Sequence, residues 1–283
     1  MNFYSLSSGS SGNCYYLGNG QQGILIDAGI STRSVIKFLK DIDVPIHTIM
    51  GILITHNHND HIKGLEVLTR KTNLPAFTTR KVWNSIISYR KDIAQDCIRE
   101  ISLHQKFHLA GFDIEAFPVN HDAPETIGFH ISEGDTKMTF VTDLGEISQT
   151  VAHYVKAANL IVIESNYDEQ MLINGRYPYY LKTRIKSNRG HLSNRQTAEF
   201  LADIINESHS NICLAHLSKN NNTPEVALKT LRQAFSERVF PVNGHPHISV
   251  LNRNTPTEMI TLTGTLSNAN RSNLKEPQSC VDE

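Results

Sequence analysis

The sequence predicts a single α/β domain, and three observations lead to this fold class. Short runs rich in β-branched and aromatic residues alternate with helical patterns along most of the chain. Hydrophobic residues make up 39% of the 283 residues and charged residues 19%, which supplies a large core and excludes a disordered chain. No repeat or Pro/Gly-rich linker divides the chain, so we expect one domain over residues 1–263 and a disordered tail over residues 264–283.

The first half of the chain reads as strands separated by two helices. The predicted strands are Asn2–Leu6, Cys14–Leu17, Gly23–Asp27, Ile49–Thr55, Phe112–Val119, Ile127–Ile131 and Lys137–Thr142. Val35, Ile36 and Leu39 lie at helical spacing and predict a helix over Ser31–Lys40. A second helix is expected over residues 79–93.

The second half repeats the alternation of strand and helix. The predicted elements are the strands Leu160–Glu164 and Ile212–Ala215 and the helices Asn194–Asn206 and Pro224–Phe235. The last helix has a clear start, because Thr223 is a good N-cap and Pro224 is tolerated at the first helical position. Ser193, with Gln196 three residues later, predicts a capping box for the helix before it.

Charge and cysteine content exclude several classes of protein. Lys+Arg 27 against Asp+Glu 28 gives a net charge of -1, which argues against a polycation that binds nucleic acid or membrane through bulk charge. Four widely spaced cysteines contain no Cys-x-x-Cys pair, so neither a disulfide framework nor a structural zinc cluster is expected. With no secretion signal and no apolar run of about 18 residues, the chain is expected to be a cytoplasmic protein without membrane contact.

The segment Thr55-His56-Asn57-His58-Asn59-Asp60-His61 is the strongest chemical signal in the sequence. It directly follows an apolar run, and in α/β sheets the carboxyl edge of the strands is where ligands bind. On an extended segment His56 and His58 point to the same side and can chelate one ion. A histidine-rich turn without metal has no packing rationale beside Asp60 and His61, so the segment predicts a metal site.

Single polar residues end three further apolar runs in the same way. They are His121 after Phe117–Asn120, Asp143 after Met138–Thr142 and His216 after Ile212–Ala215. Each alone is typical of a hydrogen-bonded turn, but together with the first cluster they supply a two-metal site. The predicted ligands are His56, His58 and His121 for one ion, Asp60, His61 and His216 for the other, and Asp143 between them. Such mixed ligands suit Zn²⁺, Mn²⁺ or Fe²⁺.

The His-x-His-x-Asp-His motif, after Ile24–Gly29 and before single His, Asp and His residues, resembles the metallo-β-lactamase superfamily. Within it the chain is similar to the YycJ/WalJ family of bacterial hydrolases. The matching segments are Ser7–Asn13, Glu164–Asp168, Gly190–Asn194 and His216–Pro224. The resemblance covers the chain to about residue 250. It implies a four-layer αββα sandwich and a 5′-to-3′ exodeoxyribonuclease linked to DNA mismatch repair.

The resemblance also implies a mechanism. Two ions would share a water, lower its pKa and present a bridging hydroxide to phosphorus. His191 is expected to give a proton to the leaving oxygen or to contact phosphate, and Glu164 to orient His191. We therefore assign Asp60, which is also a ligand, His191 and Glu164 to catalysis. A histidine that only bonds backbone before a helix cap is the alternative for His191.

Two further features lie near the expected site. Asp27 ends a predicted strand and is expected to accept a hydrogen bond from a metal ligand, although Asp-Ala-Gly is also a common turn. The Ser/Gly loop Ser7–Asn13 is either a flexible hairpin connection or a cradle of N–H groups for an anion, and Asn13 is not assigned a role.

The stretch from Met171 to Arg195 contains six basic residues and no acidic one. With interleaved tyrosines it could follow a phosphate backbone and stack on bases, although a solvated helix face has the same composition. The residues assigned to substrate binding are Arg176, Lys182, Arg184, Lys186 and Arg189. The expected partner is nucleic acid, DNA rather than RNA.

Three other functions remain open. The same fold could hydrolyse a small cyclic phosphodiester, thioester or lactam, could act as a ribonuclease, or could serve as a catalytically silent scaffold. The basic stretch, Glu164 and His191 favour a phosphodiesterase over a lactamase or thioesterase. A complete ligand set argues against a silent scaffold. Oligomeric state is left open.

Overall fold

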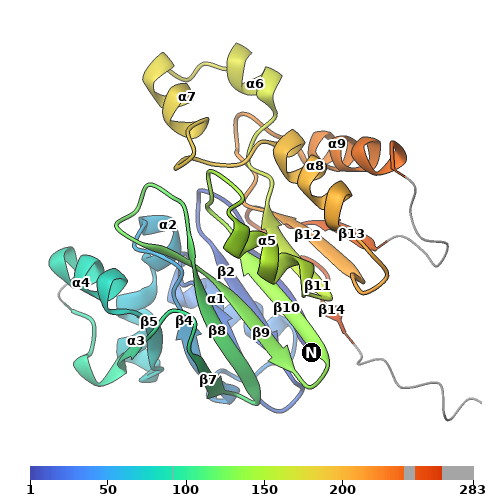
Figure 1. Ribbon diagram of the computed structural model, residues 1–283. Coiled ribbons are helices and arrows are strands. Elements are labelled where there is room, and N and C mark those ends of the chain that lie inside the picture. Colours follow the sequence, from blue (N-terminus) through green and yellow to red (C-terminus); the bar gives the residue numbers. More distant parts are fainter. Residues whose placement is uncertain (91, 239–245, 263–283) are drawn as a thin grey trace, which may run out of the picture.

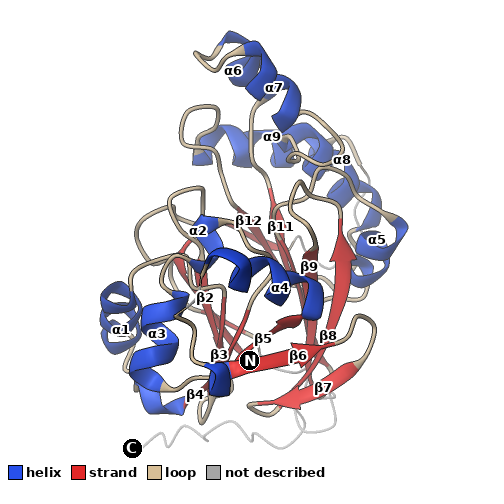
Figure 2. Cartoon of the chain, turned by 90° about the vertical axis from the view of Figure 1, so that its left-hand side faces the viewer, coloured by secondary structure: helices blue, strands red, loops and turns tan. Residues whose placement is uncertain are grey.

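Two β-sheets packed face to face form the centre of the molecule, and helices cover both outer faces (Figures 1 and 2). The computed structural model describes residues 1–90, 92–238 and 246–262. The sequence of layers is helix, sheet, sheet, helix, which confirms the predicted αββα sandwich. The tail expected over residues 264–283 lies outside the described residues.

The first sheet has seven strands in the order β14-β1-β2-β3-β4-β5-β6. β1 to β3 pair antiparallel, and β3 to β6 pair parallel. The strands are β1 (Asn2–Ser7), β2 (Cys14–Gly18), β3 (Gly23–Ile26), β4 (Ile49–Leu53), β5 (Ala76–Thr79), β6 (Ile98–Ile101) and β14 (Ile260–Thr261).

The second sheet also has seven strands, in the order β13-β12-β11-β10-β9-β8-β7. Its β7 to β10 pair antiparallel and its β10 to β13 pair parallel, so β8, β10, β11 and β12 all point the same way. The strands are β7 (Lys106–Leu109), β8 (Phe112–Val119), β9 (Thr126–Glu133), β10 (Thr136–Val141), β11 (Leu160–Glu164), β12 (Asn211–Ala215) and β13 (His247–Val250).

Nine α-helices lie in the described residues. They are α1 (Thr32–Asp41), α2 (Asn59–Ile62), α3 (Leu65–Thr72), α4 (Arg80–Tyr89), α5 (Gln149–Lys156), α6 (Glu169–Asn174), α7 (Tyr179–Ile185), α8 (Asn194–Ile204) and α9 (Pro224–Ser236). The predicted caps are confirmed, because Ser193 and Gln196 form a capping box and the Thr223 hydroxyl accepts from Val226 N.

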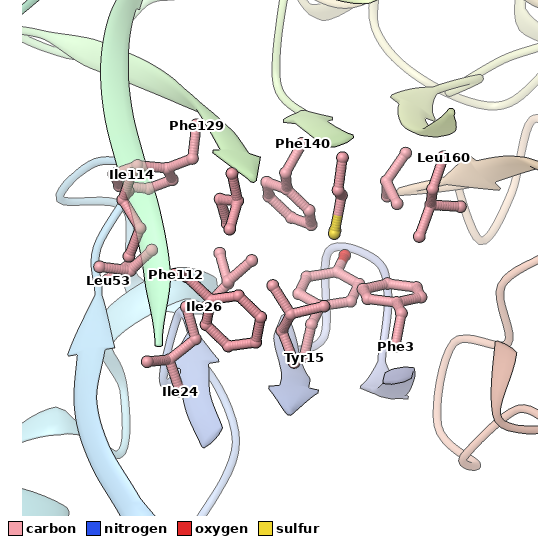
Figure 3. Packing of buried hydrophobic residues seen from close by; sticks show 14 of the residues in the cluster. Phe3, Tyr15, Ile24, Ile26, Leu53, Phe112, Ile114, Phe129, Phe140 and Leu160 are labelled. Carbon is pink, nitrogen blue, oxygen red and sulfur yellow. The ribbon is translucent and has the colours of Figure 1, made fainter. Parts of the chain in front are cut away.

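Alternation of side chains along the strands divides the core into layers. Between the sheets, Tyr15 from β2 packs edge-on against Phe140 from β10, with ring centroids 4.8 Å apart (Figure 3). The outer face of the first sheet packs against α1, α3 and α4, and that of the second against α5, α8 and α9. The pair of sheets is therefore packed between two layers of helices.

Several predicted boundaries differ from the structure. The strand expected over Ile49–Thr55 ends at Leu53, because the chain leaves the sheet to form the histidine-rich loop. The helix expected over residues 79–93 spans only Arg80–Tyr89. The sequence pattern does not predict the strands β5, β6, β7, β13 and β14, which have at most four residues, or the helices α3, α5, α6 and α7, which have at most eight. Elements this short carry little periodic pattern. No helix among the described residues is long and apolar enough to cross a membrane.

Candidate metal centre

The polar residues that end the predicted strands meet at one edge of the sandwich. Asp27 follows β3, His56 follows β4, and His121, Asp143 and His216 follow β8, β10 and β12. Because these strands run in the same direction within each sheet, their carboxyl ends bring the side chains together. The helices α6 and α7 project beyond this edge, as Figures 1 and 2 show.

Three of these residues adopt the left-handed backbone conformation. Asp27 has φ 59°, Asp143 has φ 56° and His216 has φ 54°. A residue other than glycine in this region costs of order 1 kcal/mol and persists only where surrounding contacts hold it. The three turns redirect the side chains at the strand ends, which is a feature that strand patterns do not reveal.

The first histidine group consists of His56, His58 and His121. The ring centroids of His56 lie 4.6 Å from those of His58 and 5.2 Å from those of His121. His58 Nδ1 and His121 Nε2 face each other at 3.3 Å. His121 is fixed from behind by a hydrogen bond of 2.9 Å between Nδ1 and the carbonyl of Gly190. The predicted ligands of one ion therefore lie together.

The second group surrounds the carboxylate of Asp143. Asp143 Oδ2 lies 3.1 Å from His61 Nε2 and 2.6 Å from His216 Nδ1. Its other oxygen lies 3.8 Å from His121 Nε2, in the first group. Asp60 Oδ2 lies 3.6 Å from His61 Nε2 and 3.8 Å from His216 Nε2. Asp143 thus lies between the two groups, as the sequence predicts.

Asp27 contacts His61 at the ring nitrogen that faces away from Asp143. Its carboxylate is fully buried, lies 2.7 Å from His61 Nδ1 and accepts hydrogen bonds from the backbone and hydroxyl of Thr55. This contact turns His61 Nε2 toward Asp143. The backbone at Gly29 also packs closely against that of Asp60. This contact requires glycine, since a Cβ there would lie 1.6 Å from the carbonyl oxygen of Asp60.

The arrangement of the cluster suits a metal ion. His56 Nε2 is buried with no hydrogen-bond partner among the described residues. Potential ligand atoms lie within 4.8 Å of one another in four overlapping sets, which are His56/His58/His121, His56/His61/Asp143, His121/Asp143/His191 and Asp143/Glu164/His216. Imidazole and carboxylate donors in this density suit divalent transition metals. The described residues therefore fit metal ions.

The pKa shifts of the histidines differ between the two groups. Burial lowers the pKa of His56, His58 and His121, which favours the neutral imidazole that coordinates metal. Burial also acts to lower the pKa of His61, but the carboxylates around it, Asp143 first, outweigh this effect and raise its pKa well above its usual range. Burial would raise the pKa of Asp143, but its histidine partners hold it well below the ordinary value.

A buried carboxylate orients His191 beside the cluster. Glu164 Oε1 lies 2.7 Å from His191 Nδ1, and Glu164 Oε2 accepts hydrogen bonds from the backbone N–H groups of Leu144 and Leu192. Burial would lower the pKa of His191, but Glu164 and then Asp143 outweigh it and raise the pKa to about 9. The pair predicted from sequence is therefore in contact.

Asp122 is a carboxylate at the site that the sequence analysis did not select. Its Oδ1 is buried, lies 3.2 Å from His121 Nε2 and 3.7 Å from His58 Nε2, and has no hydrogen-bond partner among the described residues. Its Oδ2 accepts a hydrogen bond from Arg184 of α7. Burial would raise the pKa of Asp122, but Arg184 and His121 outweigh it and lower the pKa. The one sequence feature that could have indicated Asp122 is its position directly after the predicted ligand His121.

Asn13 also contacts the candidate ligands. Its side-chain nitrogen lies 3.0 Å from His61 Nε2 and 3.3 Å from Asp60 Oδ2, while its oxygen accepts from the N–H of Gly9. The neighbouring Ser8 hydroxyl accepts from the backbone N–H of His216. The Ser/Gly loop is therefore packed against the cluster and is not a free hairpin connection.

The basic residues of the stretch from Met171 to Arg195 make different contacts and do not all lie beside the cluster. Arg184 contacts Asp122, and Arg189 donates to the carbonyls of His121 and Ala123, so both lie beside the cluster. Lys182 donates to a backbone carbonyl at the end of α6. Arg176 and Lys186 are exposed. Arg195, in contrast, is paired with two glutamates on α6 and α8, away from the cluster.

A cavity of about 160 Å³ opens between α7 and the cluster. Its lining includes His191 and His216 on one side, Arg184 and Tyr177 on another, and Ser10 of the Ser/Gly loop. Tyr179 and Tyr180 do not line it, because they are 85% and 74% exposed on α7. The cavity therefore joins the candidate proton donor to basic and hydroxyl groups.

Comparison with known proteins supports this interpretation of the fold. Residues 22–216 match the family model of the beta-lactamase superfamily domain. The exodeoxyribonuclease YycJ of Bacillus anthracis is 36% identical over 259 residues, which is 92% of this chain and 98% of that protein. The exodeoxyribonuclease WalJ of Streptococcus pneumoniae serotype 2 is 37% identical over 230 residues, 80% of this chain and 85% of that protein.

Solved structures give the same answer about the fold. The metallo-beta-lactamase fold protein YhfI from Bacillus subtilis superposes with a TM-score of 0.68, at 15% sequence identity. The superposition covers 91% of this chain and all of that chain. At this identity the similarity concerns the fold alone.

Proposed function

Because this chain belongs to the β-lactamase superfamily, and within it to the YycJ/WalJ family, we propose that it is a metal-dependent phosphodiesterase that degrades DNA from the 5′ end. We further propose that this activity serves DNA mismatch repair. The observation that carries the proposal is the contact of Glu164 with His191 beside the histidine cluster. A half-buried imidazole that is oriented by a buried carboxylate can give a proton to the leaving oxygen of a phosphodiester.

The proposed centre holds two divalent ions. Its proposed ligands are His56, His58 and His121 for one ion, Asp60, His61 and His216 for the other, and Asp143 for both. When bound, such ions neutralise phosphate oxygens and lower the pKa of water. Zinc and manganese are the expected metals, with iron(II) as a third candidate, because all three accept imidazole and carboxylate ligands.

The chain's own residues provide the remaining chemistry. Glu164 holds His191 through Nδ1, which leaves the proton on Nε2 for the cavity that His191 lines. Asp27 fixes the orientation of His61 through the opposite ring nitrogen. The side chain of Asp60 is 23% exposed, so it is the more accessible carboxylate of the second group, whereas that of Asp143 is buried.

The substrate preference rests on local charge, since the net charge of the chain is only -1. Arg184 lines the cavity, and Arg189 donates to the backbone carbonyl of His121. Arg176, Lys182 and Lys186 lie on the same segment of the chain. Positive groups beside a metal cluster favour a polyanion over a neutral lactam or thioester. These five residues are proposed to contact the phosphate backbone.

A substrate panel tests the proposal. Protein loaded with Mn²⁺ or Zn²⁺ is given 5′-phosphorylated DNA, RNA of the same sequence, and bis(p-nitrophenyl) phosphate. We expect DNA labelled at its 3′ end to shorten progressively. Turnover of the small ester with intact DNA would instead support a small-substrate hydrolase, and faster loss of RNA than of DNA would support a ribonuclease.

A further inference from the structure

Arg253 is a half-buried arginine whose charge has no acidic partner. No carboxylate lies within ion-pair distance of its guanidinium in the part of the chain that the structure describes. Its Nη1 is buried and makes no hydrogen bond there. Burial lowers the pKa of Arg253, which reflects the cost of holding this charge partly out of water. A half-buried cation with one unpaired, buried N–H group is an arrangement that an anionic ligand can complete.

The surroundings of Arg253 connect it to the cavity at the metal centre. A Cβ on Gly9 would lie 3.0 Å from Arg253 Nη1, so the absence of a side chain there leaves this nitrogen next to the loop backbone. The next residue, Ser10, lines the cavity that His191 and His216 also line. Tyr177, from the segment between α6 and α7, lines the same cavity.

The loop beside Gly9 and the lining of the cavity offer hydrogen-bond donors. Tyr177 accepts a hydrogen bond from Asn220 at 3.1 Å, which leaves its own O–H to donate. Within the described residues, neither the backbone N–H groups nor the hydroxyls of Ser10 and Ser11 donate to another residue. Free N–H and O–H donors around a guanidinium favour a group with several acceptor oxygens, such as phosphate.

The size of the cavity limits what can enter. About 160 Å³ is less than the roughly 300 Å³ at which pockets for whole small molecules begin, and it leaves room for a phosphate group. We propose that Arg253, with Ser10 and Tyr177, binds the terminal 5′-phosphate of the substrate strand. This inference rests on the proposed exonuclease function and identifies the feature of the strand that the enzyme recognises.

Binding can be measured apart from catalysis. Metal-loaded protein is titrated with two single-stranded oligonucleotides that differ only in a 5′-phosphate or a 5′-hydroxyl, with phosphorothioates at the first linkages to block hydrolysis and fluorescein at the 3′ end. The wild type is expected to bind the 5′-phosphate strand about 10-fold or more tightly. Arg253→Ala should remove this ratio and leave the affinity for the 5′-hydroxyl strand unchanged.

A conservative variant of Arg253 and a control at another arginine complete the test. Arg253→Lys retains the charge but loses the planar fork, so an intermediate ratio is expected even if the alanine variant fails to fold. Arg238→Ala is the matched control, because Arg238 is exposed and pairs with Asp203 on α8. A wild type that binds both strands equally, or Arg253 variants that keep the full ratio, would overturn the proposal.

Hydrolysis of the same strands without phosphorothioates separates the two proposals. Cleavage that ignores the 5′ group, together with equal binding, contradicts the terminal-phosphate site and leaves the exonuclease proposal standing. Preferential binding of the 5′-phosphate strand without cleavage of either strand supports the site at Arg253 and contradicts the exonuclease proposal.

Discussion

Asp27 Oδ2 lies 2.7 Å from His61 Nδ1, with both side chains fully buried, so one carboxylate determines which nitrogen of His61 faces the metal centre. Asp27→Asn keeps the shape of this side chain, and asparagine tolerates the left-handed backbone at this position. Loss of the charged acceptor is expected to weaken metal affinity about 10- to 100-fold. Competition with a chelating dye measures this affinity.

The matched control for Asp27 is Asp135→Asn, in an exposed turn between β9 and β10. Its metal affinity should equal that of the wild type. The role assigned to Asp27 would be wrong if Asp27→Asn bound metal as tightly as this control does.

Removal of single ligands should abolish turnover while the fold is retained. We expect His58→Ala and Asp143→Ala to lose activity by at least about 100-fold, because each takes a donor from the centre. Metal analysis should find two equivalents in the wild type and fewer in either variant. His47→Ala, on an exposed segment, is the control. Normal activity in either ligand variant would refute the assignment.

A proton donor affects only substrates that need one. His191→Ala should lower kcat on DNA by about 10²- to 10⁴-fold, because the leaving sugar oxygen must be protonated. Hydrolysis of bis(p-nitrophenyl) phosphate should change little, since nitrophenolate leaves without a proton. Glu164→Gln should give a smaller loss on DNA through misorientation of His191. Equal losses on both substrates would contradict the role of His191 as donor.

Two arginines of one basic segment should behave differently. Arg184→Ala is expected to raise KM for DNA by about 5- to 10-fold with little change for the small ester, because Arg184 faces the cavity. Arg195→Ala should leave both unchanged, because Glu169 and Glu199 neutralise Arg195 away from the cluster. A similar loss in the two variants would mean that bulk charge, and not position, binds DNA.

The stability of the fold should depend on pH through His130, which is remote from the cluster. Burial, followed by the charge of Lys137, lowers the pKa of His130 to about 4, and its Nδ1 lies 2.8 Å from the hydroxyl of Thr139. The unfolded chain, with a histidine pKa of about 6.5, binds the proton more readily. The contribution to stability is therefore complete above about pH 6.5 and is lost as pH falls toward 4.

Urea unfolding at several pH values between 7 and 4 measures this effect. His130→Gln removes the titrating group, so its free energy of unfolding should fall less steeply with acidification than that of the wild type. His47→Gln, at an exposed site, should follow the wild type. Parallel curves for wild type and His130→Gln would contradict the pKa shift of His130.

Local sequence was sufficient to predict the main strands, the helix caps and the fold class. Apolar alternation marks strands such as Phe112–Val119, and capping residues such as Ser193 act on their own neighbours. Polar residues at strand ends also predicted which side chains meet, because parallel strands present their carboxyl ends at one edge. Short elements such as β5 and α6 could not be predicted, since four to six residues show too little periodicity of apolar residues.

The residues that depend on long-range contacts became visible only in the tertiary structure. In the sequence, nothing distinguishes Asp122 from other carboxylates. Its ion pair with Arg184 of α7, which lies 62 residues further along the chain, depends on the fold. Arg253 is a surface arginine by composition. Only the packing of the Ser/Gly loop against it leaves Arg253 half-buried, with Nη1 buried and unpaired among the described residues. The histidine motif by itself predicted a site suited to metal ions. The fold decided which charges surround it, because burial and pairing are properties of segments that are distant in the chain.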